Sequence, residues 1–146
     1  MFSCHRGKLS TEQQTDAILS RHLVAHLAPS NAEPISVTVA RESALAAARR
    51  ATHMLGRKAT TLPLLHGVPV SIKDLFATKR IRTTWGSLIY KDHVPDGDDL
   101  VVQRLKTAGA IVVGKTNTPE FGAGGNTFNA VFGIRYSLVF DMSDKA

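Results

Sequence analysis

The sequence predicts an α/β protein, because segments typical of helices and short apolar segments typical of strands follow one another along its 146 residues. Residues 10–28, 39–55 and 98–108 carry the spacing or the composition of helices. Two short runs rich in valine and isoleucine, 68–72 and 110–114, suit buried strands. The second run directly follows a helix and a glycine, which is half of an α/β unit.

The amino-terminal third predicts two helices. In 10–28, Ser10 and Gln13 form a capping-box pattern, and leucines then recur every fourth residue along one face. Two prolines follow and predict a loop. The second helix, 39–55, reads "VARESALAAARRATHML" and ends before Gly56, a residue favoured after the last turn. Its alanine-rich face predicts close packing.

The middle of the chain predicts a strand and then a long loop. The strand 68–72 contains Pro69, which lacks an N–H donor and therefore predicts a strand start or a sheet edge. Residues 78–97 show no sustained period and are rich in Thr, Gly, Pro and Asp, so we expect a long structured loop.

The third helix is bounded by capping residues. Asp98 or Asp99 suits its amino-terminal cap, and Gly109 lies where a carboxyl-terminal cap is expected. The strand 110–114 follows directly. Beyond it the chain is rich in glycine, with a short helix predicted at 119–121.

The composition is that of a globular domain, with 43% hydrophobic and 21% charged residues and a formal net charge of +6. The basic residues are scattered and are not interleaved with aromatic residues, so we expect no nucleic-acid partner. Cys4 is the only cysteine, which excludes an internal disulfide and fits a reducing compartment. No secretory leader is recognisable, and no apolar run approaches about 18 residues. We therefore expect a cytoplasmic protein with no membrane partner.

One segment matches the phosphate-loop pattern G-x-x-x-x-G-K-[ST]: "GAIVVGKT", residues 109–116. A working loop needs a strand before the first glycine and a helix near the lysine. Here a helix pattern precedes Gly109, strand-like residues separate the glycines, and Pro119 interrupts any helix after Lys115. We therefore predict no nucleotide binding at this segment.

A metal site is also not expected. His22 and His26 lie four residues apart on the first predicted helix, a spacing that can hold a metal ion. No carboxylate follows His22, and two helical histidines near a loop are more often solvated or capping residues than metal ligands. Cys4 and His5 form a lone pair near the amino terminus.

Lys73 is a candidate catalytic base because it directly follows an apolar strand. Desolvation there would favour the neutral amine that a general base requires. The alternative is a strand-end lysine that pairs with Asp74 and reaches solvent. Ser71 lies two residues earlier and would point to the same side as Lys73.

Three segments resemble one enzyme family in order and spacing: "LPLLHGVPVSIKDLF", "RTTWGS" and "VVQRLKTAGAIVVGKTNTPEFGAGGNTFNAVFG". Together they are similar to the amino-terminal part of amidase-signature enzymes, from about residue 45 to residue 133. The resemblance implies an α/β fold with a mixed central sheet flanked by helices, which would be incomplete here. It also implies hydrolysis of carbon–nitrogen amide bonds by a Ser-cisSer-Lys triad, without a metal or cofactor. Lys73, in "SIKD", matches the catalytic lysine.

The resemblance extends to a threonine-rich loop, in which Thr83, Thr84, Gly86 and Ser87 match without a defined catalytic role. Ser71 is expected to be structural. Arg80 stands where the family usually has a glycine, which would strain the turn if that turn needs a positive φ.

The chain also departs from the family. The segment of the form GGSSGGS, which carries both triad serines, has no match, and neither Ser137 nor Ser143 lies in a glycine-rich context. We therefore expect a truncated and inactive form, with self-association or a complementing chain as possible partners. One alternative is a non-catalytic interaction module that pairs with a chain carrying the serines. A fragment of an aminoacyl-tRNA amidotransferase A-type subunit is an alternative, and the substrate in either parent is an amide. We expect a flexible terminus over 1–9, the family domain over 10–135 and a non-matching tail over 136–146.

Overall fold

The structure, a computed structural model, describes residues 11, 13–16, 36–56 and 61–134. Within the first predicted helix, 10–28, residues 13–16 are helical, and most of the remainder lies outside the described residues. The predicted segments 1–9 and 136–146 lie entirely outside them, as do His22 and His26.

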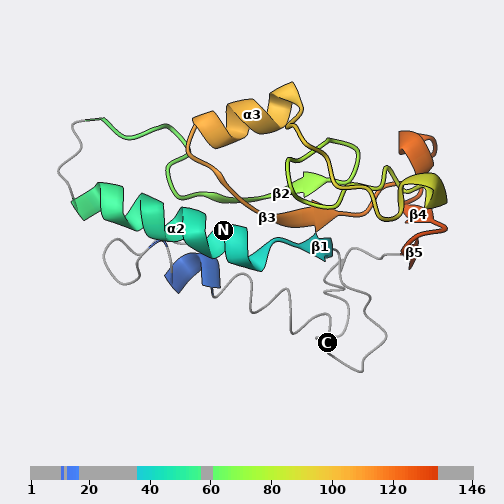
Figure 1. The fold of residues 1–146 in the computed structure, drawn as a ribbon, viewed down its shortest axis with the longest axis horizontal. Coiled ribbons are helices and arrows are strands. Elements are labelled where there is room, and N and C mark those ends of the chain that lie inside the picture. The colour runs from blue at the N-terminus through green and yellow to red at the C-terminus, as the bar shows by residue number, and fades with distance from the viewer. Residues whose placement is uncertain (1–10, 12, 17–35, 57–60, 135–146) are drawn as a thin grey trace, which may run out of the picture.

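A three-stranded mixed sheet forms the centre of the described part (Figure 1). The strands are β1 (Ser36–Val39), β2 (Pro69–Lys73) and β3 (Ile111–Thr116), in the order β1-β3-β2. β3 pairs antiparallel with β1 and parallel with β2. The two strands predicted from their β-branched residues are confirmed, and Pro69 begins β2 at the edge of the sheet, as expected. β1 was not predicted.

The two long helices cover opposite faces of this sheet, so that β3 is buried between them (Figure 1). α2 (Arg41–Gly56) confirms the second predicted helix, and its alanines let its backbone approach the sheet closely. α3 (Leu100–Thr107) covers the other face with Val102. The first apolar cluster joins Ala44, Ala48 and Ala51 to Ile111 and Val113, and the second joins Val102 to Ile72, Ile81 and Val112.

The carboxyl-terminal end of α3 is closed as predicted. Gly109 adopts φ +93°, a left-handed conformation that favours glycine. Its N–H donates to the Lys106 carbonyl at 3.0 Å, and the Ala110 N–H donates to the Leu105 carbonyl at 3.0 Å. This pair of bonds is the Schellman motif, which satisfies two carbonyls that the helix leaves unpaired.

The amino-terminal end of α3 differs from the prediction. Asp99 occupies the cap position, but its side chain makes no capping bond and instead accepts the Ala77 N–H at 2.7 Å. Asp98 likewise accepts the Lys79 N–H at 2.7 Å. Both carboxylates therefore fasten the loop after β2 to α3.

The remaining elements are short. The predicted loop 78–97 is confirmed, with one 3₁₀ turn, η1 (Leu88–Tyr90). The short helix predicted at 119–121 is the 3₁₀ turn η2 (Glu120–Gly122). β4 (Phe128–Asn129) and β5 (Gly133–Ile134) form an antiparallel pair that was not predicted. None of the helices in the described stretches has the length and apolar character of a bilayer-spanning segment.

Candidate functional site

Lys73 lies at the carboxyl end of β2, opposite Thr116 at the end of the parallel strand β3. The Asp74 N–H donates to the Thr116 carbonyl at 2.9 Å and so fixes the chain just beyond Lys73. Ser71 and Lys73 are exposed while Ile72 between them is buried, so the two polar side chains share one face, as predicted. The carboxyl ends of parallel strands are a frequent place for ligand sites in α/β proteins.

The environment of Lys73 differs in part from both expectations. Its side chain is exposed, so the described residues do not supply the desolvation expected of a base. The alternative pairing with Asp74 is wrong, because the Asp74 side chain turns into the core with 0% exposure and forms its ion pair with Lys115. Lys73 is therefore exposed on one side of the strand end, while Asp74 on the opposite side is held in the core by Lys115.

Lys115 pairs with Asp74, the residue that follows Lys73, and its side chain is completely buried. Its ammonium group donates to the Phe76 carbonyl and, at 3.0 Å each, to the hydroxyls of Thr78 and Thr83. These three bonds use all three of its N–H donors. Its Nζ atom lies 3.9 Å from an Asp74 carboxylate oxygen. Lys115 is therefore unavailable to a phosphate group, and the prediction against nucleotide binding agrees with this geometry.

Asp74 ties the threonine-rich loop to the end of β2. Its carboxylate accepts the Thr84 hydroxyl at 2.6 Å and the Thr84 N–H at 3.1 Å. Its backbone carbonyl accepts the Trp85 N–H at 3.1 Å, and the Thr84 hydroxyl accepts the Gly86 N–H at 3.1 Å. Thr84 and Gly86, two of the loop residues that matched the family pattern, thus have a structural role, which is to fasten the loop to the end of β2.

Burial dominates the electrostatics of this ion pair. Desolvation raises the pKa of Asp74, although the hydrogen bonds from Thr84 and the charge of Lys115 oppose it. Desolvation also lowers the pKa of Lys115 to about 8, against the opposing effect of Asp74. Both directions mean that removing the two charges from water costs more than their attraction returns. The pair is therefore expected to be sensitive to the loss of either partner.

Arg80 confirms the strain predicted for its turn. Its φ is +62°, in the left-handed region that glycine occupies without cost. For a residue with a side chain this conformation costs about 1–2 kcal/mol. The Arg80 N–H donates to the Pro95 carbonyl at 3.0 Å, which helps to hold the turn.

The Asp74–Lys115 pair was missed by sequence reasoning, although one signal existed. Lys115 is a charged residue at the end of the β-branched run "AIVVG", and a lysine in such a run needs a buried partner. Ser137 and Ser143 lie outside the described residues. Among those that the structure does describe, no group of three metal-ligating side chains comes together.

Comparison with known proteins identifies relatives over most of the chain. The family model described as Amidase matches residues 22–136. The A-type subunit of glutamyl-tRNA(Gln) amidotransferase from Ehrlichia ruminantium (strain Gardel) is 42% identical over 111 residues, which cover 75% of this chain and 23% of that protein. Its counterpart from Geobacter metallireducens is 41% identical over 128 residues, covering 88% and 25%. The chain thus spans about a quarter of the length of these curated relatives.

Solved structures give the same picture. An amidase family protein from Bacillus anthracis str. Ames superposes with a TM-score of 0.69 at 27% identity, covering 90% of this chain and 26% of that one. Fatty acid amide hydrolase superposes with a TM-score of 0.73 at 20% identity, covering 88% and 22%, a likeness of fold alone. These likenesses confirm the predicted fold class, a mixed α/β fold that is incomplete here, with a partial sheet of three strands.

Proposed function

Because this chain belongs to the amidase family, as its sequence predicted, we propose that it contributes the relay base of carbon–nitrogen amide hydrolysis, and that Lys73 is this base. The observation that carries the proposal is the position of Lys73. It stands exposed at the carboxyl end of β2, on a strand end that the buried Asp74–Lys115 pair holds in place.

The proposed chemistry assigns one proton transfer to Lys73. The neutral amine takes a proton through a bridging serine from a second serine, whose oxygen attacks the amide carbonyl. Backbone N–H groups stabilise the oxyanion, and the proton returns to the leaving amine. No segment of this chain matches the one that carries the two serines. The 146-residue chain is therefore expected to be inactive by itself, since members of a triad act as a unit.

The exposure of Lys73 is consistent with a base on this chain and serines on a partner segment. An exposed amine lacks the enclosed surroundings that a general base requires, and a serine-bearing segment docked over it would supply them. Ser71, on the same face, is exposed to the same partner segment. We propose that the complementing residues dock against this face.

The test is to assay the purified chain, alone and with a chain carrying the remaining part of a family enzyme, against a panel of aliphatic and aryl amides. We expect no turnover from the chain alone and turnover from the assembly. Lys73→Ala should abolish that turnover, whereas Lys91→Ala, another exposed lysine, should preserve it. Turnover by the assembly that survives Lys73→Ala would refute the assignment, and turnover by the chain alone would refute its expected inactivity.

A second candidate function is that of part of an aminoacyl-tRNA amidotransferase A-type subunit. The observation favouring it is that relatives at 41–42% identity, including those from Ehrlichia ruminantium and Geobacter metallireducens, are A-type subunits of glutamyl-tRNA(Gln) amidotransferase. The same assembly should be offered glutamyl-tRNA(Gln) beside the simple amides. Amide formation on the tRNA would select the amidotransferase, whereas turnover of simple amides alone would select the hydrolase.

A further inference from the structure

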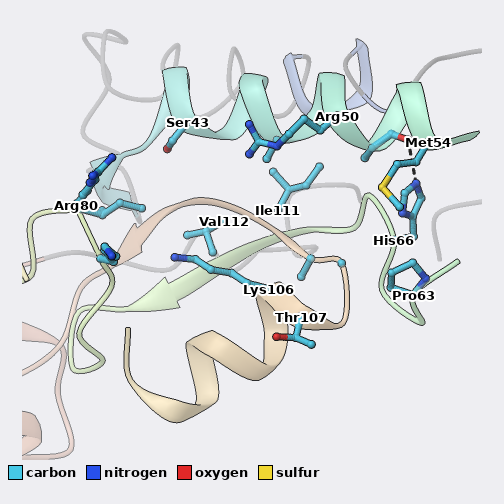
Figure 2. A pocket seen from close by; sticks show the side chains of 16 residues that line it. Ser43, Arg50, Met54, Pro63, His66, Arg80, Lys106, Thr107, Ile111 and Val112 are labelled. Carbon is cyan, nitrogen blue, oxygen red and sulfur yellow. Dashed lines mark hydrogen bonds between the residues drawn. The ribbon is translucent and has the colours of Figure 1, made fainter. Parts of the chain in front are cut away.

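A pocket of about 500 Å³ lies between α2, the loop after β2 and the carboxyl-terminal end of α3 (Figure 2). Its apolar lining includes Ala47 and Ala51 from α2, Ile81 from the loop, and Ile111 and Val112 from β3. A volume of this size accommodates a small organic molecule, and an apolar lining is typical of such sites.

The same pocket carries four cationic side chains from three separate elements: Arg50 on α2, Lys79 and Arg80 on the loop, and Lys106 on α3. No carboxylate is among its lining residues. Asp98, just outside the lining, neutralises one of the four, because both of its oxygens accept the Lys106 ammonium, at 2.7 and 2.8 Å. Within the described part of the chain, no ion pair joins Arg50, Lys79 or Arg80 to a carboxylate. Among the described residues, the positive charge at the pocket therefore exceeds the single negative charge of Asp98, which also acts on Lys79.

Arg80 provides an independent second observation. Its backbone is held at φ +62°, where glycine would be free of strain. Strained residues of this kind concentrate at ligand clamps and active sites. The arginine therefore costs conformational energy at this turn, and its side chain places a guanidinium group at the pocket.

We propose that this pocket binds a small organic anion, in which a phosphate or carboxylate group is joined to an apolar body. The guanidinium groups of Arg50 and Arg80 are planar and can form bidentate hydrogen bonds with such anions, and Lys79 adds a third positive charge. The alanine and β-branched side chains contact the apolar body. Neither part of the ligand alone would satisfy both the charged and the apolar lining.

The pocket is separate from the proposed amide-hydrolysis site. Its β3 residues, Ile111 and Val112, begin that strand, whereas Lys73 lies beside Thr116 at the other end of the sheet. Lys73 is not among the lining residues. The inference thus goes beyond the proposed function and does not depend on it.

The test is a titration of the folded chain with 1-naphthyl phosphate and with 1-naphthoate, followed by ¹H–¹⁵N NMR at the Ile111 and Val112 amides. We expect saturable shifts that weaken as salt is added, because exposed charges are screened. Comparing the two probes distinguishes a phosphate from a carboxylate ligand. Neutral 1-naphthol and inorganic phosphate should each bind more weakly than the probe that combines their features.

Arg80→Gly is the decisive variant because it relieves backbone strain while removing the guanidinium group. We expect it to weaken binding about tenfold, the loss typical of one charged hydrogen bond, while the midpoint of thermal unfolding stays equal or rises. Arg50→Ala should also weaken binding, and its control is Arg104→Ala, an exposed arginine on α3 that does not line this pocket. Unchanged affinity in Arg80→Gly, an equal loss in Arg104→Ala, or the absence of saturable binding would overturn the proposal.

Discussion

Replacing Lys115 by methionine tests the central structural claim, that a buried ion pair anchors the strand end that carries Lys73. Methionine keeps most of the side-chain volume but removes the charge and the three hydrogen bonds to Phe76, Thr78 and Thr83. Asp74 would then be buried without a counter-charge. Breaking a buried pair in this way typically costs about 3–5 kcal/mol. Small domains are stable by about 5–15 kcal/mol, so the variant should lose a large fraction of its stability.

The measurement is urea unfolding followed by circular dichroism, with Lys115→Met compared with Asp74→Asn and with the double variant. Asparagine retains an oxygen that can accept the hydrogen bonds from Thr84 but carries no charge. If the unpaired Asp74 carboxylate causes most of the loss of stability, the double variant should be more stable than Lys115→Met alone. Residues in direct contact usually show coupling energies of about 0.5–3 kcal/mol.

Two results would refute this reasoning about the pair. A cost below about 1 kcal/mol for Lys115→Met would place the lysine among ordinary surface residues rather than at a buried anchor. Strict additivity of the two single variants would show that Lys115 and Asp74 do not act together, whatever their separate costs.

Three further predictions concern the buried lysine, a close backbone approach and the exposed lysine. First, the free energy of unfolding should rise between pH 8 and 10.5, because the native chain loses the Lys115 proton near 8 while the unfolded chain keeps it to about 10.5. The free energy of unfolding should rise by at most about 3 kcal/mol, as measured by urea unfolding at each pH. The rise should be missing in Lys115→Met. If it persists in that variant, groups other than Lys115 cause it. Second, Gly114→Ala should cost at least about 1–3 kcal/mol in thermal unfolding, because the new Cβ would lie 2.3 Å from the Thr38 carbonyl oxygen. Gly97→Ala, with nothing within 4 Å of its Cβ, is the control, and equal effects of the two would contradict the close approach. Third, Lys73→Ala should change stability by less than about 0.5 kcal/mol, because the side chain is exposed. A larger loss by the same measurement would make Lys73 structural.

The helices and the two β-branched strands could be predicted because their signals are local. Alanine content and Gly56 located α2, and the Schellman pair around Gly109 follows from a glycine placed after a helix. β1 has only four residues, and its conformation depends on pairing with β3, where Gly114 allows the close approach of Thr38. Nothing in "SVTV" itself specifies that partner.

In the candidate site, too, the features with local sequence signals could be predicted and the features that depend on strand pairing could not. Lys73 could be located from its motif, and the strained turn at Arg80 from a departure at a glycine position. The contact between Asp74 and Lys115 could not be predicted, because it requires β2 and β3 to be parallel neighbours in a fixed register. The phosphate-loop pattern did draw attention to Lys115, but a pattern cannot tell a lysine that binds phosphate from one that is buried in the core.

The two lysines have complementary roles, and strand alternation explains why they need each other. Neighbouring residues at a strand end point to opposite sides, so the exposed Lys73 is followed by the buried Asp74. Asp74 reaches Thr84 and Lys115 on its side, which leaves Lys73 unobstructed on the other. A base at a free strand end would have a poorly defined position, and catalysis is sensitive to misplacements of about 1 Å. We therefore interpret the burial of the two charges as the means by which the fold fixes the position of Lys73, the proposed base, at the end of β2.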